Sequence, residues 1–275
     1  MKTYYLDYVR NKYKTCYGGD FRDCQKARAD SFHKTEMHEI VQWGFDNPAL
    51  DRNIVDTDFY NKIKVWYDRH LHGYYAWKPF VIYDLLKTIK DGDVVIYWDC
   101  NPLFSKFNCS FIPAIDYYLG EYDYIAGLQY GVKQRDWTKP ECFDLMGCTH
   151  KKYWLGRRQI QCAWSLWKKT PKTLELVSEW LHWCLQENVI AHDVNANKNK
   201  SQLRGILREI RGTFGGKHRH DQSILTNLAV KHNSNVVCCR QSSVKLSGNA
   251  GKDVRQIMCN FEKVKVIQLG NKCKW

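Results

Sequence analysis

Two oxygen-bearing side chains, Asp99 and Asn101, stand one residue apart directly after the apolar run Val94–Trp98. A carboxylate and an amide oxygen at this spacing can reach one hard cation, and Mg²⁺ or Mn²⁺ held in this way keeps open positions for the phosphates of a nucleotide. The spacing therefore indicates a diphosphate site with Mn²⁺ or Mg²⁺ as its cofactor. The alternative is ordinary turn chemistry, in which both side chains satisfy backbone donors after a strand.

A second group of reactive side chains lies upstream, where the segment 73–80 leads into a helix expected at 77–89. Lys78, in the first turn of this helix, could meet phosphate oxygens as a point charge, and the first-turn amides would add positive potential. Trp77 and Trp98 could stack on a base or a sugar ring of a bound donor. The alternative is that Lys78 points to water from an amphipathic helix and that the tryptophans fill the core.

The third group is the run His218, Arg219, His220, Asp221 and Gln222, which precedes or opens another expected helix. Histidine can ligate a metal, arginine suits phosphate, and a carboxylate can accept a proton. His220 is therefore a candidate metal ligand, with His218 as its alternative, and Arg219 and Gln222 are candidate donor-binding residues. The simpler interpretation is that Asp221 caps the helix and does nothing more.

These groups occur in an order that resembles one family. Segment 73–79 reads Gly-Tyr-Tyr-Ala-Trp-Lys-Pro, 92–101 reads Gly-Asp-Val-Val-Ile-Tyr-Trp-Asp-Cys-Asn, and 219–225 reads Arg-His-Asp-Gln-Ser-Ile-Leu. Together they resemble the nucleotide-diphospho-sugar glycosyltransferases of the GT-A fold that are found in capsular-polysaccharide loci and large DNA viruses. The likeness covers roughly residues 27–230 and includes the segments 137–143, 161–167 and 179–181.

The resemblance implies a transferase that moves a sugar from a UDP- or GDP-sugar to a hydroxyl of a glycan or glycoprotein acceptor. It also implies that Asp99 and Asn101 occupy the place of the metal-binding Asp-x-Asp motif, and that Asp221 is the catalytic residue beside the reacting sugar. Such enzymes usually carry a second aspartate where this chain has Asn101. Because an amide adds no charge, we expect a more weakly held cation, a further ligand from His218 or His220, or binding mainly through the nucleotide phosphates.

The expected mechanism follows from these roles. The cation, together with Lys78 or Arg219, would neutralise the leaving β-phosphate, a stabilisation that grows as the glycosidic bond breaks. Asp221 would be the general base of an inverting reaction, or would position or stabilise the sugar in a retaining one. The sequence leaves both stereochemical outcomes open.

Alternating strands and helices must position these residues. The alternation predicts an α/β fold with a mixed, mostly parallel sheet flanked by helices, in which ligands bind at the carboxyl ends of strands. The resemblance implies that this is the GT-A (Rossmann-like) fold. We expect a single domain, 1–275, with a nucleotide-binding part at about 1–130 and an acceptor and catalytic part at about 131–275. The expected strands are 4–9, 39–43, 94–98, 124–130 and 162–166, and the expected helices are 23–32, 56–67, 77–89, 112–119, 172–185 and 222–230.

The composition bears on the localisation of the protein and on the state of its cysteines. The apolar runs fall short of the ~20 residues of a spanning helix, and the first residues lack the apolar stretch of a signal peptide, so we expect no transmembrane anchor and a cytoplasmic protein. The 12 cysteines contain no Cys-x-x-Cys pair, which favours reduced thiols.

The net charge defines the rival functions. An excess of 42 Lys and Arg over 29 Asp and Glu, a formal charge of +13, attracts anionic partners. One rival is a metal-dependent nuclease or nucleic-acid-binding protein, but no nucleic-acid motif is recognisable, so we expect no nucleic-acid partner. The other rival is an inactive glycosyltransferase-like binding protein, which Asn101 motivates.

Overall fold

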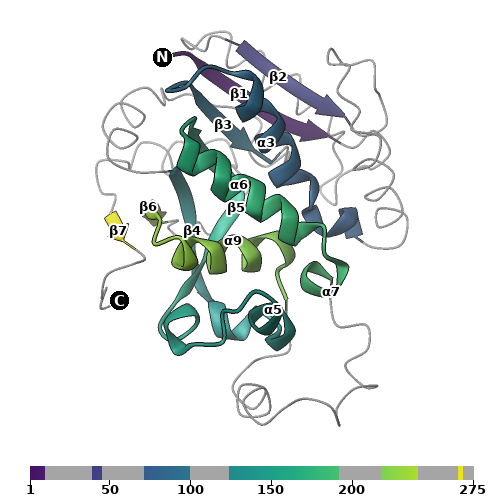
Figure 1. Ribbon diagram of the computed structural model, residues 1–275, viewed down its shortest axis with the longest axis vertical. Helices are drawn as coiled ribbons and strands as arrows, with labels where there is room; N and C mark the ends of the chain where they lie inside the picture. The colour runs from purple at the N-terminus through teal and green to yellow at the C-terminus, as the bar shows by residue number, and fades with distance from the viewer. Residues whose placement is uncertain (10–38, 45–70, 100–123, 192–217, 241–265, 269–275) are drawn as a thin grey trace, which may run out of the picture.

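A seven-stranded sheet forms the centre of the computed structural model, which describes residues 1–9, 39–44, 71–99, 124–191, 218–240 and 266–268 (Figure 1). The strand order is β2-β1-β3-β5-β4-β6-β7. The bounds are β1 Thr3–Val9, β2 Glu39–Gly44, β3 Val94–Trp98, β4 Tyr124–Lys133, β5 Arg158–Lys168, β6 Asn235–Arg240 and β7 Val266–Gln268. All five expected strands are present, and β5 is longer at both ends than the sequence predicted.

The sheet is mixed and helices pack against it, which confirms the predicted α/β class. The prediction of a mostly parallel sheet is wrong, because half of the described strand pairings are antiparallel. Parallel pairing joins β1 to both β2 and β3 and joins β4 to β6, whereas β5 runs antiparallel to its neighbours β3 and β4, and β7 runs antiparallel to β6. Because β5 runs antiparallel beside β3, the middle of β5 meets the end of β3, where Trp98 is paired with Trp164. Asp99, directly after β3, therefore lies beside the centre of β5.

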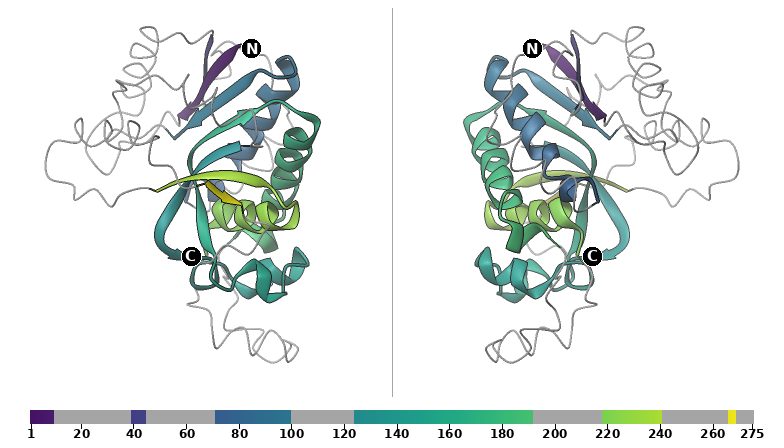
Figure 2. Two further views of the ribbon diagram at one scale, coloured as in Figure 1. Left: turned by 90° about the vertical axis from the view of Figure 1, so that its left-hand side faces the viewer. Right: turned by 90° about the vertical axis from the view of Figure 1, so that its right-hand side faces the viewer.

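Three helices of 12 to 14 residues, α3, α6 and α9, lie side by side on one face of the sheet (Figures 1 and 2). The expected helices at 77–89, 172–185 and 222–230 are all found, while those at 23–32, 56–67 and 112–119 lie outside the described residues. The helical bounds are η1 Leu71–Tyr75, α3 Trp77–Thr88, η3 Gln134–Asp136, α5 Pro140–Leu145, η4 Lys151–Tyr153, α6 Pro171–Cys184, α7 Glu187–Ile190 and α9 His220–Lys231.

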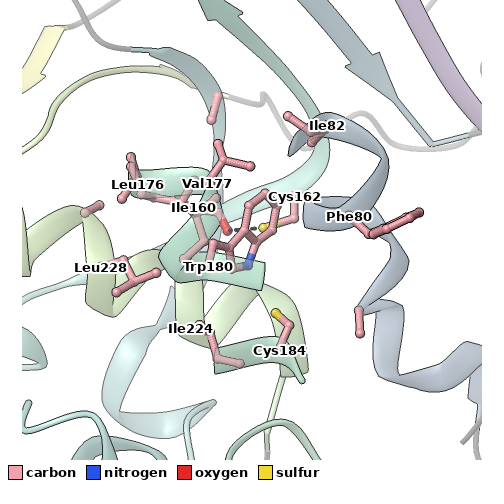
Figure 3. Close-up of a cluster of buried hydrophobic side chains, with 14 of the residues drawn as sticks. Phe80, Ile82, Ile160, Cys162, Leu176, Val177, Trp180, Cys184, Ile224 and Leu228 are labelled. Atoms are coloured by element: carbon pink, nitrogen blue, oxygen red, sulfur yellow. Dashed lines mark hydrogen bonds between the residues drawn. The ribbon is translucent and has the colours of Figure 1, made fainter. Parts of the chain in front are cut away.

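Helix α6 shows why these segments are helical and how they pack. The Thr170 hydroxyl accepts a hydrogen bond from the Thr173 amide, and Pro171 occupies the first turn, where its missing N–H costs nothing. Trp180 is buried, and its indole N–H donates to the Asp221 carbonyl oxygen at 3.0 Å, which ties α6 to α9. Figure 3 shows the buried α6 side chains Leu176, Val177, Trp180 and Cys184 beside Ile160 and Cys162 of β5 and Ile224 and Leu228 of α9.

The core extends through the centre of the sheet. All five residues of β3 are buried, as expected for a strand covered on both faces. Trp167 and Tyr124 are fully buried and stack with their ring centroids 4.3 Å apart. Each buried side chain of this size contributes roughly 2–3 kcal/mol of hydrophobic stabilisation, so the strands that carry the site are held rigidly.

Two further expectations concern the chain as a whole. Within the described residues, Cys142, Cys148, Cys162 and Cys184 are free thiols, as the scattered cysteines predicted. None of the described helices combines the length and the apolar character needed to cross a bilayer. The division into parts at 1–130 and 131–275 stays a prediction, although one sheet contains strands from both.

Candidate functional site

A cavity of about 350 Å³ opens at the carboxyl end of β3. The amino-terminal ends of α3 and α9 both reach it, since Lys78 and Asp221 are the second residues of these helices. Helix N-termini carry partial positive charge, so two of them at one cavity favour an anionic ligand. The lining residues are Tyr75, Lys78, Asp99, Gln161, Ala163, His218, Arg219, His220, Asp221 and Gln222.

Lys78 stands between two carboxylates on the cavity wall. It is only 5% exposed, and its Nζ lies 2.8 Å from Asp99 Oδ2 and 3.7 Å from Asp221 Oδ2. The same Nζ donates to the Cys162 carbonyl oxygen at 3.3 Å. Burial alone would lower the pKa of Lys78, but the charges of Asp99 and Asp221 outweigh it and raise the pKa. Lys78 therefore does not point to water, and that interpretation is wrong.

Asp99 is fixed by both its backbone and its side chain. Its amide donates to the Ala163 carbonyl oxygen at 2.6 Å, which continues the pairing of β3 with β5 by one residue. The Tyr97 hydroxyl donates to Oδ1 at 2.5 Å, and Lys78 donates to Oδ2. The carboxylate thus faces side-chain donors of the cavity. Asn101 lies outside the described residues, so its pairing with Asp99 stays a prediction.

Asp221 combines deep burial with a carboxylate oxygen that lacks a hydrogen bond. It is 3% exposed, and its Oδ2 accepts no hydrogen bond from the described residues. Burial and the neighbouring charge of Asp99 raise the pKa of Asp221 to about 7, while Lys78 opposes that rise. The N-cap of α9 is Arg219, so the simple capping role for Asp221 is wrong. A carboxyl group with a pKa near neutrality is suited to accept a proton from a substrate.

The two histidines of the site carry their protons on opposite ring nitrogens. His220 Nδ1 lies 2.8 Å from the Ile190 carbonyl oxygen, which can only accept, so Nδ1 is the donor and Nε2 is the nitrogen able to accept or to ligate. His218 Nδ1 accepts from the Lys139 amide at 3.3 Å, so the neutral ring carries its proton on Nε2. Of the two, His220 therefore suits a metal-ligand role, and His218 suits donation to a ligand oxygen.

A buried network fixes the side chain of Gln222. Gln159 Nε2 donates to the Trp137 carbonyl oxygen at 3.0 Å and also to Thr138 and Ser223 hydroxyls, so its amide nitrogen faces that side. Gln159 Oε1 therefore faces Gln222 and accepts from Gln222 Nε2 at 2.9 Å. Gln222 thus gives its amide nitrogen to this network, and the residue also lines the cavity.

Aromatic rings border the cations of the cavity. The Arg219 guanidinium lies 4.5 Å from the Trp137 ring centroid, and Lys78 Nζ lies 4.9 Å from the Tyr75 ring centroid. Tyr75 follows Gly73 and Tyr74 in a run of three positive φ angles of 54°, 55° and 65°. Such a run costs roughly 1–2 kcal/mol for each residue other than glycine, and the surrounding packing holds it. This strained turn presents the Tyr75 ring to the site.

The structure brings most of the expected site residues together. Lys78, Asp99, Arg219, His220, Asp221 and Gln222 all line the cavity. Trp77 and Trp98 do not: they are 6% and 3% exposed, and their rings pack on Tyr97 and Trp164. Their contact with a donor stays a prediction. Tyr75, Gln161 and Ala163 were not expected at the site.

The described residues fit a divalent cation in donor type but do not complete a site for one. Asp99 and Asp221 direct carboxylate oxygens to the same point, and one of these oxygens accepts no hydrogen bond, as a cation ligand would require. However, Lys78 stands at that point, and no group of three or more His, Cys, Asp or Glu side chains within the described ranges is arranged to hold a metal. The predicted ligand set of Asp99, Asn101 and His220 therefore stays a prediction.

Comparison with known proteins adds little to this geometry. No protein-family model matches the chain, and no curated protein is significantly similar to it. Among solved structures, the chain is similar to the galactosyltransferase LgtC in complex with donor and acceptor sugar analogues, at 13% identity and a TM-score of 0.34, over 82% of this chain and 70% of that chain. At this TM-score the similarity establishes neither the family nor the activity.

Proposed function

We propose that this protein is a glycosyltransferase that moves a sugar from a nucleotide-diphosphate sugar to a hydroxyl of a glycan or glycoprotein. The observation that carries the proposal is the cavity in which Lys78 and Arg219 accompany the buried carboxylate of Asp221 and the partly exposed carboxylate of Asp99. The cations and two helix N-termini suit a diphosphate, and a carboxylate that titrates near neutrality suits proton transfer from a hydroxyl. The order of motifs 73–79, 92–101 and 219–225 supports the same class.

Each residue has a role in the proposed reaction. Lys78 and Arg219 stabilise the negative charge that develops on the leaving β-phosphate as the bond between the anomeric carbon and the phosphate oxygen breaks. The acceptor oxygen forms the new bond to that carbon. In an inverting reaction its proton passes to Asp221, and in a retaining reaction Asp221 instead stabilises the sugar. The anomeric configuration of the product distinguishes these two roles.

A divalent cation belongs to the proposal as a cofactor. Asp99, Asn101 and His220 would hold Mn²⁺ or Mg²⁺, which when bound supplies further positive charge for the diphosphate. His220 Nε2 is the ring nitrogen suited to this role, because Nδ1 donates to the Ile190 carbonyl oxygen. Gln222, which lines the cavity, would contact the bound donor.

Thermal unfolding with nucleotide sugars tests the donor class. We expect a UDP- or GDP-sugar to raise the midpoint, since a ligand at about 100 times its dissociation constant adds about 2.7 kcal/mol of stability. The same screen with and without Mn²⁺ tests the cofactor. A protein that no nucleotide sugar stabilises, but that nucleic acid does, would support the rival nuclease or nucleic-acid-binding function.

Substitution of Asp221 tests the chemistry. Asp221→Asn should lower kcat by about 10²–10⁴-fold, because the amide cannot accept the proton or stabilise positive charge, while nucleotide-sugar binding persists. Asp144→Asn, on the exposed surface of α5, is the matched control and should leave turnover unchanged. Full turnover in Asp221→Asn would remove Asp221 from the mechanism.

A further inference from the structure

A compact cationic turn leads from α5, at the end of the molecule opposite β2, into β5 (Figure 1). We call residues 151–158, Lys-Lys-Tyr-Trp-Leu-Gly-Arg-Arg, the basic turn. The Leu155 amide donates to the Lys151 carbonyl oxygen at 2.8 Å, and Arg157 Nε donates to the Lys152 carbonyl oxygen at 3.1 Å. These bonds fold the segment on itself, so its cations are gathered in one place.

A leucine stands exposed at the tip of the basic turn. Leu155 is 55% exposed, and among the described residues the other exposed large hydrophobic side chains are Leu145 at 43% and Met1 at 62%. Gly156, which follows it, has a φ of 69°, a conformation that favours glycine and turns the chain into β5. The neighbouring Trp154 donates from its indole to the Thr149 carbonyl oxygen and packs on the core. The tip is therefore anchored while Leu155 stays in water.

Positively charged side chains flank this leucine in the sequence. Residues 145–167 contain four Lys and Arg, namely Lys151, Lys152, Arg157 and Arg158, and no Asp or Glu. Lys151 and Lys152 are exposed, and the exposed Lys133 on β4 lies opposite Arg158 in the strand register. A single exposed leucine is ordinary on a protein surface, but an exposed leucine flanked by several cationic side chains is not.

We propose that the basic turn docks this protein on the surface of an anionic phospholipid membrane. Leu155 enters the boundary between headgroups and acyl chains, and Lys151, Lys152 and Arg157 lie over the anionic headgroups. A phospholipid surface offers both a negative potential and an apolar layer just beneath it, which matches the two properties of the turn. A nucleic-acid backbone supplies only the charge and leaves the aliphatic tip in water.

Vesicle co-sedimentation of the full chain tests the proposal. The wild type should bind vesicles of phosphatidylcholine mixed with phosphatidylglycerol and should not bind phosphatidylcholine alone. The pair Lys151→Glu and Lys152→Glu should lower the partition coefficient about 30-fold or more, since each cation near the surface contributes about a 5-fold factor. Leu155→Ser should lower it about 10-fold and make the remaining binding more sensitive to salt, because only the electrostatic part is left.

A matched control separates this turn from the overall charge. Lys87 and Lys90 are exposed lysines at the far end of α3, and their replacement by Glu changes the net charge by the same amount. This control should retain vesicle binding. Equal losses in the two double variants, or unchanged binding in the basic-turn variants, would overturn the proposal. Loss of RNA or duplex DNA binding with vesicle binding intact would assign the turn to nucleic acid instead.

Discussion

The cavity and the outer surface of the helical layer each contain a lysine paired with a carboxylate, in very different surroundings. In the cavity cluster, Lys78 with Asp99 and Asp221, the lysine side chain is 6% exposed and Asp221 has its pKa raised to about 7. In the surface cluster, Lys231 lies 2.7 Å from Glu179 with its side chain 40% exposed, and the pKa of Glu179 falls to about 2. A lysine–carboxylate pair thus accompanies a raised carboxyl pKa in the cavity cluster and a lowered one in the surface cluster.

The number of donors for each carboxylate explains the difference. Burial raises the pKa of Glu179, but hydrogen bonds from Lys231, Trp183 and His232 outweigh it. Asp221 is buried more deeply, and Lys78 lies closer to Asp99 than to it. The surface cluster is therefore organised to stabilise the fold, whereas the cavity cluster holds a carboxyl group at a cost in stability, as functional sites do.

Removal of the lysine from each cluster should give the largest contrast. Lys78→Met leaves the buried carboxylate of Asp221 and the partly exposed carboxylate of Asp99 without their cation, and should lower the free energy of unfolding by about 3–5 kcal/mol. Lys231→Met removes a partly exposed ion pair and should lower it by about 0–1 kcal/mol. Urea denaturation at neutral pH measures both. Similar losses in the two variants would show that burial does not distinguish the clusters.

The two clusters should also differ in how the stability of the protein depends on pH. The raised pKa of Asp221 means that the folded state binds more protons than the unfolded state between pH 3.8 and about 7. Stability therefore falls as pH rises through this window, by an amount on the order of 4 kcal/mol. The Asp221→Asn variant should lack this fall when unfolding is measured in urea from pH 4 to 8. A wild-type curve parallel to that of the variant would contradict the assignment.

The surface cluster should show a smaller effect of opposite sign. Because the pKa of Glu179 lies at about 2 instead of 4.5, its contribution is complete above pH 4.5 and is lost as pH falls towards 2. Solvent screening reduces this contribution to about 1 kcal/mol. The Glu179→Gln variant should therefore lose less stability than the wild type on acidification. Unfolding midpoints that fall equally between pH 5 and 3 would argue against the cluster.

Local patterns account for what the sequence predicted. Strand β3 follows from an unbroken apolar run, and α6 from a threonine cap, a first-turn proline and apolar residues at helical spacing. Lys78, Asp99 and Asp221 could be chosen because each follows or opens such an element. The site residues could therefore be predicted where they lie at the ends of helices and strands.

Non-local pairing accounts for what the sequence missed. Nothing in segment 158–168 indicates that it runs antiparallel between β3 and β4, so Gln161 and Ala163 could not be placed beside Asp99. The burial of Lys78 depends on Asp221, which α9 brings from far along the chain. The positive φ of Tyr75 has no local signal either, because tyrosine is not a residue that favours it.

The contact between Lys78 and Asp221 can form only late in the synthesis of the chain. These residues are about half the chain apart, and the lysine emerges from the ribosome long before the helix that supplies its second carboxylate. Of its described partners, Asp99 and the Cys162 carbonyl oxygen are synthesised first. The cavity is therefore completed late in translation, and a polypeptide truncated before α9 lacks the second carboxylate that faces Lys78.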